Sequence, residues 1–265
     1  MIKLIALDID GTLYNQHDEI MPLTRSALLR AHKNGVILVL ASGRSLHGLR
    51  NLILKQRIPL DKTILLCYNG GVVADAESNE ILFEDLFDED LSKRIITHAQ
   101  QFPLTLMVPC KDVLWVQDPN GFNVAYASSS ENHTVKVMPD LSLIDFCPNK
   151  LMISADPKVL DQVMDQLIEP FKREVHFLKS RPDFIEINPK GVDKGSALRK
   201  YCDLMKIGAS EVLAFGDSYN DLTMIEYAGI GVAMGNAVDE VKAIADAVTL
   251  SNNEDGIGHF LNDYF

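Results

Sequence analysis

Five short apolar runs constrain the fold of this chain more than any other feature of its sequence. Three lie near the beginning, within residues 2–8, 36–42 and 62–71, and two come after residue 210, within residues 211–217 and 230–236. Each run is short and is ended by polar residues or glycine, as in a strand that is buried on both faces. Stretches of helical apolar spacing, such as residues 22–35, separate the runs. This alternation predicts a parallel β-sheet that is covered by helices on both faces.

The middle of the chain has a different pattern, which begins after the hairpin-favouring pair Asn69-Gly70. Strand-like segments with alternating polarity, such as residues 104–109, mix there with helix-like ones, such as residues 157–171. The opening pattern of strand and helix then returns near Pro189. We therefore predict one α/β core that is split by an α+β insertion at residues 84–188.

The overall charge restricts the partners of the protein. With 37 acidic and 25 basic residues, the formal net charge is −12, which disfavours nucleic acid and anionic membranes but not a small anionic substrate. No apolar run approaches the roughly 20 residues of a membrane helix, and the first residues do not resemble a signal peptide. The four cysteines lack metal-ligand spacing, as expected of reduced thiols in a cytoplasmic protein. No feature of the sequence predicts an oligomeric state.

Two of the predicted strands lead directly into pairs of acidic residues. Asp8 and Asp10 follow the apolar part of the segment "LIALDIDGTL", and Asp217 and Asp221 follow "LAFG". If the two strands are neighbours, the carboxylates share one sheet edge, where their mutual repulsion favours a bound cation. Oxygen ligands of this kind favour Mg²⁺. For each acidic residue taken alone, an ordinary turn residue is the favoured interpretation. Two apolar strands that each end in a spaced pair of acidic residues favour the cation site instead.

Two further segments could bind an anion. Ser42-Gly43 joins a strand to a helix, where free backbone N–H groups and a hydroxyl can receive a phosphate; the alternative is simple N-capping by Ser42 or Ser45. Lys194 falls in the first turn of a predicted helix, where the helix dipole disfavours a cation unless an anion is near. Its alternative is a solvated surface lysine.

Taken in order, the segments "DIDGT", "ASGR", "DKG" and "GDSYND" resemble the four motifs of the haloacid dehalogenase superfamily. The details are most similar to its Cof-type phosphatases, and the resemblance spans almost the whole chain. It implies a Rossmann-like, doubly wound core of residues 1–83 and 189–265 with a large inserted α+β cap of residues 84–188. It also implies that the Asp8 strand lies between those of Ser42 and Asp217.

The resemblance implies roles for the residues of these motifs. Asp8 is expected to be the nucleophile and Asp10 the general acid and base. Ser42, Gly43, Lys194 and Asn220 are expected to bind the phosphate or to orient its ligands. The expected Mg²⁺ ligands are Asp8, Asp10 through its carbonyl, Asp217 and Asp221.

The expected activity is hydrolysis of small phosphorylated metabolites through an aspartyl-phosphate. The cap is expected to close over the cleft by movement at residues 83–87 and 188–192. Arg181 and Asp183 are candidates for substrate selection, although an ordinary charged turn is the favoured interpretation. The alternative functions are a phosphomutase or phosphotransferase on the same scaffold, a phospho-aspartate signalling receiver, and a non-catalytic binding protein.

Overall fold

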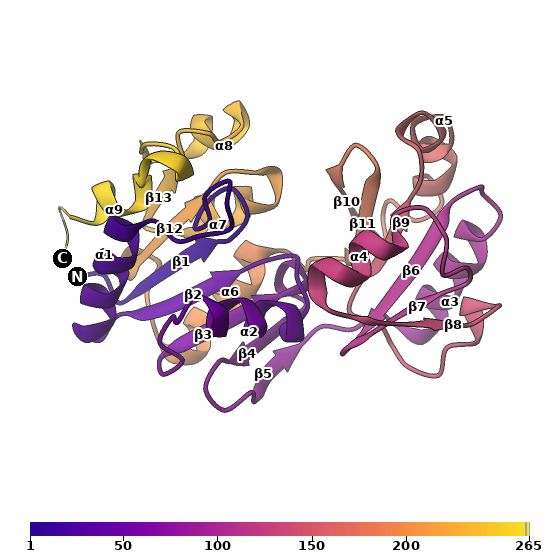
Figure 1. Cartoon of the computed structure of the whole chain (residues 1–265), viewed down its shortest axis with the longest axis horizontal. Helices are drawn as coiled ribbons and strands as arrows, with labels where there is room; N and C mark the ends of the chain where they lie inside the picture. Colours follow the sequence, from indigo (N-terminus) through magenta and orange to yellow (C-terminus); the bar gives the residue numbers. More distant parts are fainter. Residues whose placement is uncertain (263, 265) are drawn as a thin grey trace. The chain divides into compact units, whose positions relative to one another are not determined.

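The computed structural model describes residues 1–262 and 264, with Ser180 described by its backbone alone. The chain divides into two compact units (Figure 1). Unit 1 comprises residues 1–43 and 49–83 and the chain from residue 193 onward, and Unit 2 comprises residues 44–48 and 84–192. The predicted α/β class, with a parallel core sheet and an inserted second domain, is confirmed.

Unit 1 is built on an eight-stranded sheet in the order β14-β13-β12-β1-β2-β3-β4-β5. Its strands are β1 (Leu4–Asp8), β2 (Ile37–Ala41), β3 (Thr63–Cys67), β4 (Val72–Asp75), β5 (Ile81–Glu84), β12 (Val212–Gly216), β13 (Ile230–Ala233) and β14 (Ala247–Val248). Its helices are α1 (Pro22–Lys33), α2 (Leu46–Lys55), α6 (Lys194–Met205), α7 (Leu222–Tyr227), α8 (Asp239–Ile244) and α9 (Gly256–Leu261). The first turn of α2 groups with Unit 2.

The centre of this sheet is parallel, as the apolar runs predict. β1 pairs in parallel with β2 and with β12, so that Leu4 lies beside both Ile37 and Val212. All residues of β1, β3 and β12 are buried. β4 then pairs antiparallel to β3 after a short turn at Tyr68–Gly70. The beginning and the later part of the chain therefore form one sheet.

Unit 2 has a six-stranded sheet in the order β10-β11-β9-β6-β7-β8. Its strands are β6 (Thr105–Cys110), β7 (Val113–Val116), β8 (Thr134–Val137), β9 (Leu151–Ser154), β10 (Val175–Arg181) and β11 (Phe184–Pro189), and its helices are α3 (Glu89–Ala99), α4 (Val124–Glu131) and α5 (Pro157–Ile168). The β7–β8 pair is parallel and the other pairs are antiparallel.

Side chains that alternate along the strands of Unit 2 form two separate cores. Val108 and Ile153 pack in the cluster that contains α3 and α5, whereas Met107 and Met152 pack in the cluster that contains α4. Neighbouring residues of a strand point to opposite faces, so α3 and α5 cover one face of the sheet and α4 the other.

The second boundary of the insertion lies slightly later than the sequence predicts. β11 continues to Pro189, which pairs with Val175, and the backbone N–H of Val192 donates to the carbonyl of Pro189 at 3.1 Å. Residues 189–192 therefore group with Unit 2 rather than with the core. The sheet pairing of Pro189 accounts for the shift, because a strand end that is paired cannot act as a free connector.

Helix α1 depends on a residue from the far end of the chain. Its N-cap, Met21, makes no capping bond, but the Asp255 carboxylate accepts from the backbone N–H groups of Leu23 at 2.8 Å and Thr24 at 2.7 Å, and from the Thr24 hydroxyl at 2.6 Å. The carboxylate thus satisfies donors that a helix N-terminus leaves open. α1 turns Ala27, Leu28 and other small or apolar residues inward.

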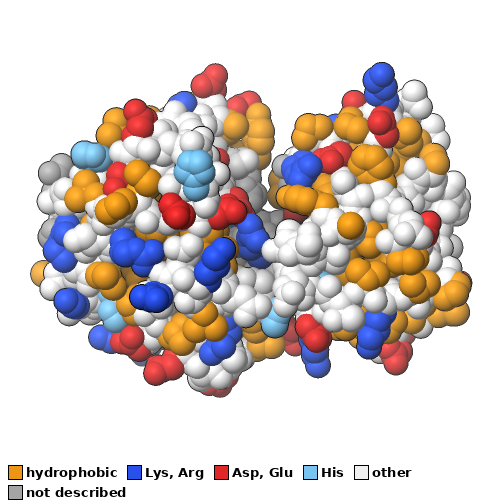
Figure 2. All heavy atoms as spheres, viewed as in Figure 1, with side chains coloured by type: hydrophobic (Ala, Val, Ile, Leu, Met, Phe, Trp, Pro, Cys, Tyr) orange, Lys and Arg blue, Asp and Glu red, His pale blue; other side chains and the backbone are white. Residues whose placement is uncertain are grey.

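The outer surface of Unit 1 around α1 and α2 carries many basic side chains (Figure 2). On the face shown in Figure 2, Lys and Arg side chains spread over the region that carries α1 and α2. The net negative charge of the chain is therefore not uniform over its surface. Within residues 1–262 and 264, no helix combines the length and the apolar character that crossing a membrane requires.

We predict that Asp255→Gly lowers the free energy of unfolding by about 1–3 kcal/mol, because α1 loses its N-terminal acceptor. Glycine avoids strain at residue 255, whose φ is +61°. Asp255→Asn keeps one oxygen acceptor and tolerates this conformation, so it should lower the free energy of unfolding by less. Denaturant unfolding of the three proteins tests this, and an Asn variant as unstable as the Gly variant would contradict it.

Candidate active site

The carboxyl edge of the Unit 1 sheet brings together the polar residues that follow three strands. β1 ends at Asp8, β12 ends immediately before Asp217, and β2 ends immediately before Ser42. β1 lies between β2 and β12, as the resemblance implies. The chain order therefore reverses beside Asp8, and ligands of open α/β sheets bind at such a point.

Three carboxylates meet at this edge. Oxygen atoms of Asp8, Asp217 and Asp221 all lie within 4.8 Å of one another. Asp8 and Asp221 are buried, and Asp217 is half-buried. Asp221 Oδ2 accepts from the backbone N–H groups of Asp217 at 2.9 Å and Ser218 at 3.0 Å. These bonds fix the Asp221 carboxylate against the end of β12.

A buried lysine lies among these carboxylates. Lys194 is the first residue of α6 and has no solvent exposure. Its Nζ donates to Asp8 Oδ1 at 2.5 Å and to Asp221 Oδ1 at 2.7 Å. Removing an ammonium from water costs several kcal/mol unless opposite charges compensate it. The carboxylates supply that compensation, and the interpretation of Lys194 as a solvated surface lysine is wrong.

Burial is the main influence on the ionisation of the carboxylates. It raises the pKa of Asp8 well above its ordinary value, and the Asp221 charge adds to this effect while Lys194 opposes it. Burial also raises the pKa of Asp217 to about 6, although a hydrogen bond from Thr12 acts against it. Burial alone would lower the pKa of Lys194, but Asp221 and Asp8 raise it by more. Without a further cation, burial therefore makes Asp8 and Asp217 harder to ionise than exposed carboxyls.

The charge and the donor atoms of the cluster fit a divalent cation. Three carboxylates and one ammonium leave two uncompensated negative charges when all four groups are ionised. Two carboxylates about 5 Å apart repel by about 3 kcal/mol at an effective dielectric constant near 20. Hard oxygen donors favour Mg²⁺. Asp8, Asp217 and Asp221 are therefore the residues that could hold such an ion.

Asp10 lies outside this group of three carboxylates. Its side chain is exposed, and its backbone forms an isolated bridge with Tyr14. The chain turns sharply between these residues at Gly11, whose φ is +91°. A Cβ atom at Gly11 would come within 2.5 Å of an oxygen of Asp217, so glycine is required for this approach. The predicted roles of Asp10, as acid, base and carbonyl ligand, stay predictions.

Ser42 and Ser45 do not share the same task. The Ser45 hydroxyl accepts from the backbone N–H of Gly48 at 3.0 Å and so caps the start of α2. Ser42 is buried, and its carbonyl accepts from the backbone N–H of Asn69 at 2.9 Å. The sequence offered Ser42 and Ser45 as alternative N-caps, and Ser45 is the residue that caps α2. Phosphate binding by Ser42 and Gly43 stays a prediction.

Asn220 is tied to the end of β3. Its amide donates to the side-chain oxygen of Asn69 at 3.1 Å. Asn69 adopts a left-handed conformation, with φ of +55°, in the turn that follows β3. The contact links the turn before α7 to the turn after β3 on the same side of the sheet. Any role of Asn220 toward phosphate or Lys194 stays a prediction.

The match with known proteins covers the whole of this architecture. A sequence model of haloacid dehalogenase-like hydrolases matches residues 5–261. The chain belongs to this family. The prediction of a Cof-type hydrolase is thereby confirmed, and the alternatives of a signalling receiver and of a non-catalytic binding protein lose their basis.

Individual members of the family cover nearly the full chain. YxeH from Bacillus subtilis strain 168 is 34% identical, with 99% of this chain and 98% of that protein covered. YcsE from the same strain, a 5-amino-6-(5-phospho-D-ribitylamino)uracil phosphatase, is 31% identical over 97% of this chain and 93% of that protein. A haloacid dehalogenase-like hydrolase from Bacteroides thetaiotaomicron has a solved structure with a TM-score of 0.91 at 32% identity, with 100% of both chains covered.

Two residues of this site were given no role from the sequence. Thr12 is buried, and its hydroxyl donates to Asp217 at 2.7 Å. Asn69 anchors Asn220 and binds the carbonyl of Ser42. Thr12 belongs to "DIDGT" and Asn69 to "YNGG", so the motifs contained both residues. Their hydrogen-bond partners, however, come from distant segments that only the fold identifies.

Because burial raises the pKa of Asp217 from 3.8 to about 6, we predict that the contribution of Asp217 to the stability of the metal-free protein falls as pH rises from about 4 to above 6. In that window Asp217 binds more protons in the folded protein than in the unfolded chain, so its contribution to the free energy of unfolding falls with rising pH. Mg²⁺ should reverse the loss most strongly near pH 7. Thermal unfolding in EDTA and in Mg²⁺ measures both effects.

Asp217→Asn is the matched control for this prediction, because the amide does not titrate. The difference in stability between wild type and this variant should change across the window. A constant difference in metal-free protein would contradict the assignment of the titration to Asp217.

Proposed function

We propose that this chain is a Mg²⁺-dependent phosphatase that hydrolyses phosphate monoesters of small metabolites through an aspartyl-phosphate on Asp8. The observation that carries the proposal is the Lys194 ammonium, buried between Asp8 and Asp221 within the cluster of three carboxylates. Such a site combines a carboxylate nucleophile with fixed positive charge, which is what transfer of a phosphoryl group requires.

In the first step, a carboxylate oxygen of Asp8 attacks phosphorus, and the bond from phosphorus to the ester oxygen breaks. Asp10 donates a proton to the departing alkoxide, which is otherwise a poor leaving group. One carboxyl group cannot serve both purposes, because Asp8 must be ionised while Asp10 must carry a proton. The exposed position of Asp10 suits exchange of that proton with solvent.

In the second step, Asp10 removes a proton from a water molecule as the water oxygen attacks phosphorus. The bond between phosphorus and Asp8 then breaks, which releases inorganic phosphate and restores the Asp8 carboxylate. Lys194 reduces the repulsion between Asp8 and the anionic phosphate in both steps. Ser42, Gly43 and Asn220 bind or orient the phosphate.

Asp8, Asp217 and Asp221, with the carbonyl of Asp10, would hold Mg²⁺. When bound, the ion supplies positive charge that offsets the surplus of carboxylates and the charge of the phosphate. The Thr12 hydroxyl, bound to Asp217 at 2.7 Å, orients that carboxylate for the metal in the manner of an outer-shell ligand partner.

The proposed substrate is a small phosphorylated metabolite, such as a sugar phosphate or a phosphorylated cofactor. The relative YcsE, which acts on a phosphorylated ribitylaminouracil by name, supports this class. The four cysteines are all free thiols, which supports a reducing, cytoplasmic location. A phosphotransferase on the same scaffold would pass the phosphoryl group to a sugar instead of to water.

We expect phosphate release from a panel of sugar phosphates, phosphorylated cofactors and nucleotides to require Mg²⁺ and to fall by roughly a thousandfold or more in Asp8→Asn. The variant keeps the size of the side chain but replaces the nucleophilic carboxylate with a neutral amide. Its binding of Mg²⁺ and its thermal unfolding should be measured in parallel. Undiminished release by Asp8→Asn would overturn the nucleophile, and transfer to an added sugar without release would favour the phosphotransferase.

The acid role of Asp10 predicts a dependence on the leaving group. Asp10→Asn should slow hydrolysis of alkyl phosphates by roughly ten- to a thousandfold more than hydrolysis of aryl phosphates, whose leaving groups need little protonation. Rates on a series of esters with graded leaving-group pKa test this. Equal losses across the series would exclude proton donation by Asp10.

A further inference from the structure

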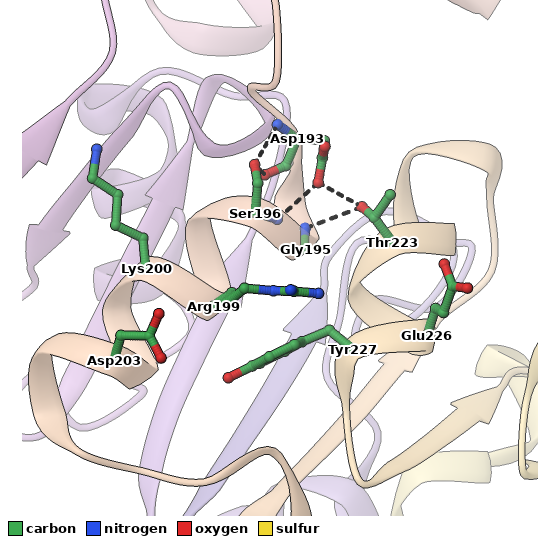
Figure 3. A pocket seen from close by; sticks show the side chains of 9 residues that line it. All are labelled: Asp193, Gly195, Ser196, Arg199, Lys200, Asp203, Thr223, Glu226 and Tyr227. Carbon is green, nitrogen blue, oxygen red and sulfur yellow. Dashed lines mark hydrogen bonds between the residues drawn. The ribbon is translucent and has the colours of Figure 1, made fainter.

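The helices α6 and α7 border a groove of about 650 Å³ on Unit 1, lined in part by Asp193, Gly195, Ser196 and Thr223 (Figure 3). Lys194 lies between Asp193 and Gly195 in the sequence, but its side chain points away from the groove, to the buried carboxylates. The wall of the groove is therefore the outer side of the segment that carries the buried ammonium.

Thr223 connects the two helices through its hydroxyl. Thr223 Oγ1 donates to the carboxylate of Asp193 at 2.7 Å and accepts from the backbone N–H of Gly195 at 3.1 Å. Figure 3 shows these bonds joining the start of α6 to α7. The hydroxyl thus binds the residues immediately before and after Lys194.

The same carboxylate holds the start of α6 in place. Asp193 is the N-cap of the helix, and it accepts from the backbone N–H of Ser196 at 2.8 Å, while the Ser196 hydroxyl lies 3.0 Å from the backbone nitrogen of Asp193. This reciprocal arrangement is a capping box. Thr223 extends it from one helix to a second helix.

The two helices also touch through their backbones at this point. A Cβ atom at position 195 would meet the carbonyl oxygen of Thr223 at 2.2 Å, so glycine is needed for the close approach. Two residues before Thr223 in the chain is Asp221, which binds the Lys194 ammonium at 2.7 Å. α6 and α7 are therefore joined on the buried side by an ion pair and on the groove side by the Thr223 hydroxyl.

We propose that Thr223 is a positioning residue for Lys194, in an enzyme of the activity proposed above. Its hydroxyl keeps the start of α6 and the start of α7 in the register that places the ammonium between Asp8 and Asp221. Thr223 is exposed to the groove and has no contact with the carboxylate cluster among the hydrogen bonds of the described residues. It acts on Lys194 through the neighbouring residues, by its bonds to the Asp193 carboxylate and to the backbone N–H of Gly195.

The test compares Thr223→Val with Thr223→Ser. Valine keeps the shape of threonine and loses the hydroxyl, whereas serine keeps the hydroxyl and loses a methyl group. We expect Thr223→Val to lower kcat by about tenfold with KM changed by less than about twofold, because a displaced ammonium weakens stabilisation of the transition state. Thr223→Ser should restore kcat to within about twofold of wild type.

Thr63→Val is the matched control. It is also a threonine to valine change in Unit 1, and it removes a hydroxyl bond to the Pro59 carbonyl at 2.7 Å at a fully buried position. Thr63 begins β3, at the opposite end of the strand from Cys67 and the turn that holds Asn69. The Thr63→Val variant should lower the melting temperature at least as much as Thr223→Val and leave kcat unchanged.

Amide hydrogen exchange gives a readout that does not depend on the reaction. Exchange at Gly195 should be faster in Thr223→Val than in wild type and Thr223→Ser, because the valine cannot accept the Gly195 N–H. A kcat for Thr223→Val within twofold of wild type, or a Thr223→Ser variant as slow as Thr223→Val, would overturn the proposal. If Asp8→Asn kept its activity, the proposed function would be overturned instead. The exchange rate at Gly195 would then decide whether Thr223 fixes the register of α6 and α7.

Discussion

The arrangement of the active site depends on one interaction, the burial of the Lys194 ammonium between the carboxylates of Asp8 and Asp221. A lysine without solvent contact is stable only when opposite charges lie close to it, and the three carboxylates are tolerated at one sheet edge only when cations lie among them. Lysine and carboxylates thus require each other. The cluster remains negative even so, and the remaining charge is what makes it suitable for a divalent cation.

The sheet order makes this interaction possible. Asp8 comes from β1, Asp217 and Asp221 follow β12, and Lys194 begins α6. Residues from distant parts of the chain therefore meet at one edge, as Asp8 and Lys194 do across 186 positions. β1 is the strand from which the chain proceeds in one direction to β2 and β3 and, after Unit 2, in the other direction to β12 and β13. Hydrogen bonds such as those of Thr223 and Asn69 then fix the loops on which the charged groups lie.

Much of this could be predicted from the sequence, because the information was local. Continuous apolar runs identify β1, β2, β3, β12 and β13, and the spacing of Asp8 and Asp10 after a strand indicates chemistry at its end. Pairings between distant segments could not be read in this way. The burial of Lys194, the bond from Thr12 to Asp217, and the division of tasks between Ser42 and Ser45 all depend on which segments become neighbours. The extension of β11 to Pro189 has the same cause, since Val175 supplies its partner.

The cap of α1 by Asp255 has a consequence for the order in which the chain can fold during synthesis. Unit 2 is complete when the ribosome has added Val192, and all its strands pair with one another. Unit 1 cannot complete its fold at that stage. β1 lacks its neighbour β12 until residue 216 has been added, and α1 lacks the Asp255 carboxylate that accepts its N-terminal N–H groups until residue 255 has been added. The nascent N-terminal segment therefore spends most of translation incomplete, and the part of the chain that is made second is the first that can finish folding.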